Sequence, residues 1–257
     1  MNLSKFQKHV TNTLIENQNE VFSFNYDNKK YWLKKARATH STIAHKIYYK
    51  LFPFEVLLPV KEKTAVESIR FEIDKIKYFK KIGLNTPNII LHTENYFVLE
   101  DCGKMVNSYI RKRDITQEKM TYFIDKLVDT LVLIHNNGEF HGGAQARNFL
   151  YNNGKIFVID LEDSFDNNID LKLLQFRDLF LLLLSFTKTR SSFEFNYKYV
   201  IESYIAKSNN NDFKQRFISL GSKLSWLISL SEIKIINKFL GRDVKGFFKL
   251  LKSIKSL

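Results

Sequence analysis

The chain has 257 residues, 44% of them hydrophobic and 14% aromatic, which is enough apolar material for one large domain or two small lobes. Its single cysteine, Cys102, excludes an intramolecular disulfide framework, and its longest apolar run, residues 179–186, is far shorter than the roughly 20 residues that span a bilayer. The net charge of +13 leaves three classes of partner open: nucleic acid, an anionic membrane face and a phosphorylated substrate.

The first predicted pair of strands lies near the N-terminus. Residues 21–24 and 30–34 are β-prone and flank a turn-rich segment, so we expect a hairpin. Strand alternation places Lys34 on the face of Trp32 and Lys35 on the opposite face. One of these two lysines therefore points inward, and alternation alone does not decide which.

A helix is predicted over residues 65–81. Thr64 and Glu67 form a capping box, and Gly83 follows where the helix would end. Its apolar stripe contains Glu72, whose carboxylate would be costly to bury without a partner. Glu72 either pairs with a lysine from a neighbouring strand or lies at the edge of the stripe and reaches water.

Two more strands, residues 89–91 and 96–99, follow Pro87, and the composition then changes from strand-rich to helix-rich. We therefore divide the chain into an N-terminal lobe, residues 1–103, and a helical lobe, residues 104–257. The fold class is α+β, with a small antiparallel sheet and one main helix in the first lobe.

The second lobe contains two well-marked helices. Residues 116–136 have a regular apolar stripe, and residues 171–186 are apolar all round, which is typical of a centrally buried helix. Asp178 lies inside the second helix and needs a hydrogen-bonding partner, so we expect it to be a structural anchor.

Between these helices the sequence predicts a second hairpin. Asn153-Gly154 is a strong signal for a type I′ turn and separates two β-prone runs, residues 149–151 and 156–159. Extending this register would place Asn148 opposite Ile159 and gather Asn148 and Asp160 at the open end. Oxygen ligands of this kind suit Mg²⁺, although an exposed polar loop is an equal alternative.

The C-terminal segment is strongly basic. From Ile233 onward it has seven basic residues and one acidic residue, with apolar residues at helical spacing. This pattern is typical of an amphipathic helix that either meets an anionic membrane or a partner, or packs on the body of the protein. Because the N-terminus lacks the apolar segment of a secretory signal, we expect a cytoplasmic protein, with peripheral contact at the inner membrane as a further expectation.

The order of these elements resembles the protein-kinase-like superfamily, from about Val21 to Phe186. The resemblance implies a two-lobed fold that binds ATP and Mg²⁺. It implies that Lys34 holds the ATP phosphates, that Glu72 pairs with this lysine, and that residues 97–103 form the hinge for adenine, with Glu100 and Cys102 as its cofactor-binding residues. The implied catalytic loop begins at His141, with Asn148 and Asp160 as metal ligands and Asp160 also a catalytic residue.

Short motifs point further, toward bacterial lipopolysaccharide kinase-like proteins related to the Kdo and heptose kinases. These motifs are residues 31–36, the proline-containing connection before the helix over residues 65–81, the turn from Gly83 to Pro87, residues 98–103 and residues 175–179. This resemblance implies that the acceptor is a hydroxyl of a sugar or lipopolysaccharide precursor at the cytoplasmic membrane face.

Two departures from the kinase pattern stand out. No glycine precedes Gly83, so a glycine-rich phosphate loop is missing. Gly143 stands where the family has its catalytic aspartate, so Arg147 would have to neutralise charge and Gln145 or Asp163 would have to orient the acceptor. The chain is therefore either a kinase without the usual base or a pseudokinase. Nucleic-acid binding ranks last, because the aromatic residues lie in apolar stripes rather than among the basic ones.

Overall fold

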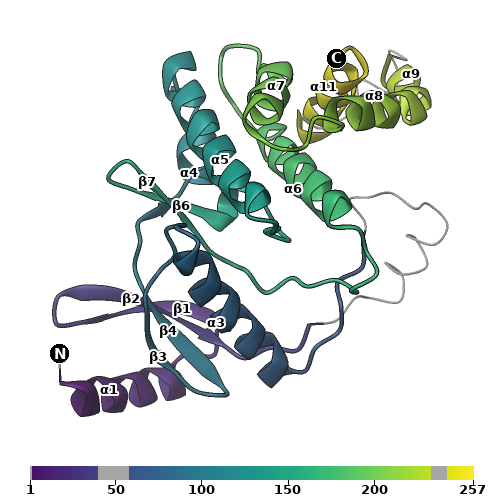
Figure 1. Ribbon diagram of the computed structural model, residues 1–257. Coiled ribbons are helices and arrows are strands. Elements are labelled where there is room, and N and C mark those ends of the chain that lie inside the picture. The colour runs from purple at the N-terminus through teal and green to yellow at the C-terminus, as the bar shows by residue number, and fades with distance from the viewer. Residues whose placement is uncertain (1, 40–57, 233–241) are drawn as a thin grey trace. The chain divides into compact units, whose positions relative to one another are not determined.

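The structure is a computed structural model that describes residues 2–39, 58–232 and 242–257 (Figure 1). The chain divides into two compact units: Met1–Gly103 with Phe157–Asp166, and Lys104–Ile156 with Asn167–Leu257. The first unit contains an antiparallel sheet and the second is mostly helical. The predicted α+β fold class is confirmed.

The sheet of the first unit has the strand order β1-β2-β4-β3. Its strands are β1 (Val21–Tyr26), β2 (Lys29–Lys35), β3 (Ile89–His92) and β4 (Tyr96–Glu100). The predicted first hairpin is confirmed, and it turns at Asp27 and Asn28, which have φ angles of 49° and 57°. Asparagine and aspartate tolerate this left-handed conformation better than other non-glycine residues.

Helix α1 (Leu3–Glu16) covers one face of this sheet. Phe6 and Val10 of α1 are fully buried against a core that includes Phe22, Phe24 and Leu33. Lys35 is on this side too, because its Nζ donates to the backbone oxygen of Asn17 at 2.7 Å. Alternation along β2 therefore sends Trp32 and Lys34 to the opposite face.

Helix α3 (Ala65–Lys81) begins and ends where the sequence predicted. The hydroxyl of Thr64 accepts from the backbone nitrogen of Glu67, and the Glu67 carboxylate accepts from the backbone nitrogen of Thr64, which completes the capping box. Glu72 lies on the buried stripe and is only 3% exposed. The alternative that Glu72 reaches water at the stripe edge is therefore wrong.

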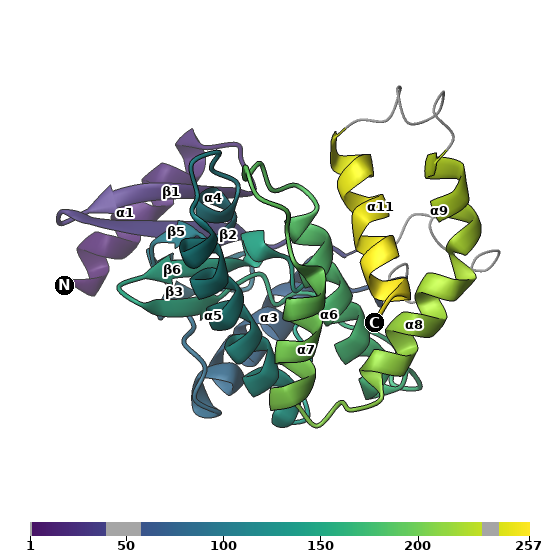
Figure 2. The ribbon, with the colours of Figure 1, turned by 90° about the horizontal axis from the view of Figure 1, so that it is seen from above.

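The second unit is built mainly from helices around α6 (Figure 2). They are α4 (Asn107–Ile110), α5 (Gln117–Asn136), α6 (Leu171–Phe186), α7 (Tyr197–Lys207), α8 (Phe213–Lys223), α9 (Ser225–Glu232) and α11 (Arg242–Lys255). A small sheet has the order β5-β6-β7, with β5 (Lys104–Met105), β6 (Phe149–Asn152) and β7 (Lys155–Val158). Most of α6 is buried, as its nearly all-apolar sequence predicted.

The C-terminal helix α11 packs on the helical unit. Leu250, Leu251 and Ile254 are fully buried, and a Cβ on Gly246 would overlap the backbone oxygen of Thr187. Much of the apolar stripe proposed for a membrane is therefore already covered by protein, while the lysines of α11 lie on its exposed side. Lys234 and Lys238, part of the same basic segment, lie outside the described residues. In the described part of the chain, no helix is both long and apolar enough to cross a membrane.

Candidate nucleotide site

The first unit places Lys34 at the centre of a polar cluster. Lys34 is near the end of β2, and its Nζ lies 2.8 Å from Oε2 of Glu72 on α3. The expected pairing of Glu72 with a strand lysine is confirmed. Lys34, rather than Lys35, is the lysine that points to the helix.

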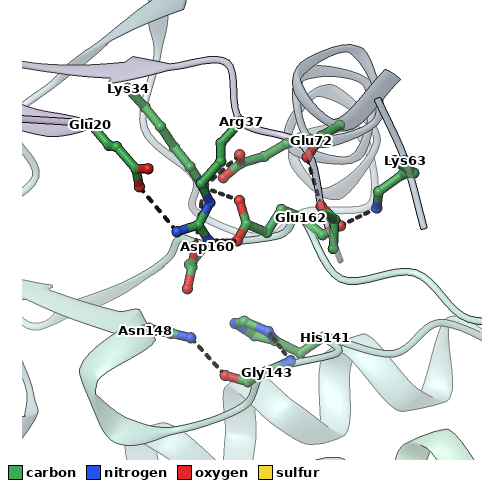
Figure 3. A network of polar contacts seen from close by, with 12 residues as sticks. Glu20, Lys34, Arg37, Lys63, Glu72, His141, Gly143, Asn148, Asp160 and Glu162 are labelled. Carbon is green, nitrogen blue, oxygen red and sulfur yellow. Dashed lines mark hydrogen bonds and ion pairs between the residues drawn. The ribbon is translucent and has the colours of Figure 1, made fainter. Parts of the chain in front are cut away.

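Two further carboxylates contact the same ammonium group. Nζ of Lys34 lies 3.1 Å from Oδ1 of Asp160 and 2.8 Å from Oε2 of Glu162 (Figure 3). Leu161, between the two acids, is fully buried. Asp160 has a φ angle of 62°, a left-handed conformation that is uncommon outside glycine and that is often found at functional sites.

Charge and burial act against each other in this cluster. Burial alone would lower the pKa of Lys34, but Glu72, Asp160 and Glu162 together outweigh it and hold the pKa above its usual value. Burial raises the pKa of Glu72, and the contact with Lys34 only partly offsets this effect. Lys34 is therefore a permanent cation, and Glu72 depends on it for its charge.

Two more basic residues fasten Glu162 and the segment after it. Arg37 bridges Glu20 and Glu162, with its terminal nitrogens 3.0 Å and 3.4 Å from their carboxylate oxygens. Nζ of Lys63 donates to the backbone oxygen of Glu162 and, at 2.9 Å, to the hydroxyl of Ser164. Burial lowers the pKa of Lys63, since the nearby acids only partly compensate for the lost hydration.

The sequence did not assign a site role to Glu162, Arg37 or Lys63. A usable signal was present for Glu162, because Asp160 and Glu162 are two residues apart around an apolar residue. In an extended segment this spacing would put both acids on one side, although the φ angle of 62° at Asp160 shows that the chain is not extended at that residue. Arg37 and Lys63 had no such signal, since their contacts come from distant parts of the chain.

The predicted hinge is tied to its own unit by side chains. The Glu100 carboxylate accepts from the backbone and side-chain nitrogens of Asn88, at 2.9 Å and 2.7 Å. The Cys102 thiol donates to Glu100 at 3.7 Å, and burial raises the pKa of Cys102 to about 12, so it stays protonated. Both side chains thus stabilise the predicted hinge, and the backbone nitrogens of Glu100 and Asp101 donate to the backbone oxygens of Asn88 and Lys30.

The predicted catalytic loop belongs to the second unit and is anchored by Asp178 on α6. The backbone nitrogens of His141 and Gly142 donate to the Asp178 carboxylate at 2.6 Å and 3.0 Å. The guanidinium of Arg177 donates to the backbone oxygen of Gly142. The prediction that Asp178 is a structural anchor is confirmed. His141 is fully buried, and its Nδ1 accepts from the backbone nitrogen of Gly143 at 3.2 Å.

Asn148 closes this loop (Figure 3). Its Nδ2 donates to the backbone oxygen of Gly143 at 2.8 Å, which directs the amide oxygen Oδ1 to other ligands. Asn148 is only 7% exposed, so the alternative of an exposed polar loop is wrong for this residue. Arg147 is exposed and Gln145 is half-buried.

The extended hairpin register is also wrong, although the turn itself is confirmed. Asn153 and Gly154 have φ angles of 46° and 82°, as a type I′ turn requires. However, β6 begins at Phe149, and Ala146–Asn148 form a 3₁₀ turn. The backbone nitrogen of Ala146 donates to the hydroxyl of Ser185 at 2.9 Å, so contacts with α6 end the strand pairing before it reaches Asn148.

A buried polar network continues from Asp178 into the helices. Nε2 of His135 lies 3.5 Å from Asp178, and Nδ1 of His135 lies 2.5 Å from the hydroxyl of Tyr204. Asn210 donates to the same hydroxyl at 2.7 Å. Burial lowers the pKa of His135 despite its contact with Asp178, so the folded protein keeps this imidazole neutral.

We expect this network to make the helical unit less stable in mild acid. The unfolded chain protonates His135 near pH 6.5, whereas the folded chain does so only at lower pH, so stability falls as the pH drops below about 6.5. Urea unfolding at pH 7.5 and pH 5 measures this loss. The loss should be smaller in His135→Gln and unchanged in His92→Gln, whose histidine is exposed. An equal loss in all three proteins would contradict the assignment.

Comparison with known proteins supports a kinase-like identity. A family model of the RIO domain matches residues 21–200. The chain belongs to the RIO domain family. RIO domains are an atypical protein-kinase-like family, so the kinase-like part of the resemblance is confirmed.

This RIO domain protein also resembles an uncharacterized protein of Haemophilus influenzae. The two are 23% identical over 158 residues, which is 61% of this chain and 59% of the relative. The match thus spans about three fifths of each protein. Neither comparison concerns lipopolysaccharide kinases, so that narrower part of the resemblance remains a prediction.

Proposed function

We propose that this RIO domain protein is a kinase-like phosphotransferase that binds Mg-ATP at Lys34. The observation that supports this most strongly is the 2.8 Å ion pair between Lys34 and Glu72, with Asp160 on the same ammonium group. A lysine held by a helix carboxylate is the means by which kinase-like proteins hold ATP phosphates. RIO domains in general use ATP and Mg²⁺.

No group of three or more His, Cys, Asp or Glu suited to a metal occurs among the described residues, but a magnesium ion would not require such a group. Magnesium needs only one or two protein oxygens, because phosphates and water supply the rest. We propose Asp160 and the Oδ1 of Asn148 as its protein ligands. Bound there, the ion would neutralise phosphate charge.

The remaining predicted site residues receive narrower roles. His141 is fully buried and its Nδ1 accepts from the backbone nitrogen of Gly143, so we assign it to positioning rather than to proton transfer. Arg147 is exposed and could neutralise charge on the transferred phosphate, and Gln145 could orient the acceptor. Glu100 and Cys102 support the hinge, whose backbone would receive the adenine.

For the acceptor we propose a hydroxyl of a sugar or lipopolysaccharide precursor at the cytoplasmic membrane face. Support for this comes from the short motifs shared with lipopolysaccharide kinase-like proteins. The exposed lysines of α11 would suit an anionic lipid or substrate, but the buried stripe of that helix offers little apolar surface for insertion.

A second candidate function is that of a pseudokinase that binds nucleotide without transferring phosphate. Gly143 favours it, because this position carries the acceptor base in active kinases. General-base catalysis typically contributes about 10²–10⁴-fold to a rate. A kinase that lacks it would be slow, and a scaffold would have no need of it.

Turnover of ATP by purified protein tests the proposal and separates the two candidates. With Mg²⁺, we expect slow turnover by the parent, none by Asp160→Asn, and at least about tenfold faster turnover by Gly143→Asp, which restores a base. Turnover by Asp160→Asn at the parental rate would contradict the proposed site. ATP binding without turnover by the parent would favour the pseudokinase.

A further inference from the structure

The ammonium group of Lys34 has no donor to spare for a phosphate. A lysine has three N–H donors. The Nζ of Lys34 contacts three separate carboxylates, those of Glu72, Asp160 and Glu162, at 2.8, 3.1 and 2.8 Å (Figure 3). A phosphate oxygen can therefore receive a hydrogen bond from Lys34 only if one of these carboxylates leaves.

Glu72 is poorly suited to leave. Its side chain is 4% exposed and lies on the buried stripe of α3. If Glu72 released Lys34, its carboxylate would stay in the core without a counter-ion, which is strongly unfavourable. Asp160 is the proposed metal ligand, so its transfer to the metal would free one donor of Lys34. A lysine that contacts two phosphates of the nucleotide needs a second donor, which leaves Glu162 as the carboxylate to displace.

Glu162 has a second cation within reach. Its Oε1 lies 3.4 Å from Nη2 of Arg37 while its Oε2 lies 2.8 Å from Lys34. The Arg37 side chain is 57% exposed, so it can follow the carboxylate at little cost. Glu162 can thus leave Lys34 without losing all of its charge pairing.

The backbone beside Glu162 is fastened independently of its carboxylate. Lys63 donates to the backbone oxygen of Glu162 and to the hydroxyl of Ser164. The backbone nitrogen of Lys61 donates to the backbone oxygen of Ser164 at 2.8 Å. A rotation of the Glu162 side chain therefore requires no movement of the segment that carries Asp160.

We propose that the Glu162 carboxylate is an internal competitor for the phosphate position on Lys34, and that nucleotide binding transfers it to Arg37. This inference rests on the proposed function and adds a residue that sets nucleotide affinity. A phosphate group must displace the Glu162 carboxylate from Lys34. The apparent affinity for nucleotide is therefore lower than it would be if Glu162 did not contact Lys34. The site should consequently favour highly charged ligands, nucleoside di- and triphosphates over monophosphates.

The test is calorimetric titration of ATP, with Mg²⁺ present, into the parent and a set of variants at Glu162, Glu94 and Arg37. Glu162→Ala should bind ATP about tenfold more tightly than the parent, because no carboxylate has to be displaced. Glu94→Ala is the matched control, because it removes the same charge from the same unit. Glu94 is an exposed partner of Arg70, so the affinity of this variant for ATP should equal that of the parent. Glu162→Gln serves the same purpose as Glu162→Ala if the alanine variant does not fold.

A double-mutant cycle with Arg37 distinguishes the transfer of Glu162 from Lys34 to Arg37 from a general effect of charge. Arg37→Met should weaken ATP binding in the parent, since Glu162 loses its second cation, but should have little effect in the Glu162→Ala background. Equal effects of Arg37→Met in both backgrounds, or parental affinity in Glu162→Ala and Glu162→Gln, would overturn the inference. Absence of ATP binding in every folded variant would instead overturn the proposed function on which it rests.

Discussion

Replacing Asp178 with asparagine is expected to lower the free energy of unfolding of the helical unit by about 3 kcal/mol or more. The carboxylate is fully buried and accepts from the backbone nitrogens of His141 and Gly142. An asparagine side chain can present only one oxygen, and its amide N–H groups would face other donors. If the remaining oxygen keeps the bond from His141, Gly142 loses its 3.0 Å partner and retains only the longer contact of 3.3 Å.

Urea unfolding followed by circular dichroism measures this loss. Asp129→Asn is a matched control, because Asp129 is 56% exposed and pairs with Lys207 on the surface. That change should cost less than about 1 kcal/mol. A loss in Asp178→Asn no larger than in Asp129→Asn would show that Asp178 does not anchor the loop.

The local elements of the fold follow from the sequence because their signals are local. The capping box at Thr64 and the Asn153-Gly154 turn each depend on a few adjacent residues, and the structure contains both. The nearly all-apolar composition of α6 likewise predicts its burial without any knowledge of its neighbours.

The parts of the site that the sequence predicted less well depend on distant contacts. The 3₁₀ turn at Ala146–Asn148 is held by a hydrogen bond to Ser185 on α6. The hairpin register was predicted from the turn alone, without this contact from a distant helix. The choice between Lys34 and Lys35 needed the position of α3. Glu162 was visible as an acid, but its contact with Lys34 depends on the path of residues 157–166 back to the first unit.

Replacing Lys34 with methionine is expected to have the other large effect, on both stability and nucleotide binding. Glu72 would lose its counter-ion inside the core, and breaking a buried pair in this way typically costs about 3–5 kcal/mol. The pKa of Glu72, already raised by burial, would rise further. Since its folded pKa would then lie still further above its unfolded pKa, the stability deficit should be larger at pH 8 than at pH 5.

The second variant Lys34→Met/Glu72→Gln separates folding from binding. It removes both charges of the buried pair and should recover most of the stability lost in Lys34→Met. A deficit that is independent of pH, or no recovery in the double variant, would contradict the ion pair as the cause.

Calorimetric titration of Mg-ATP into the parent and into folded Lys34→Met/Glu72→Gln tests the central claim most directly. We expect a single nucleotide site in the parent and at least about 100-fold weaker binding in the double variant, since the phosphates lose their cation. Equal affinity in the two proteins, or no binding to the folded parent, would contradict the assignment of Lys34 as the centre of a nucleotide site.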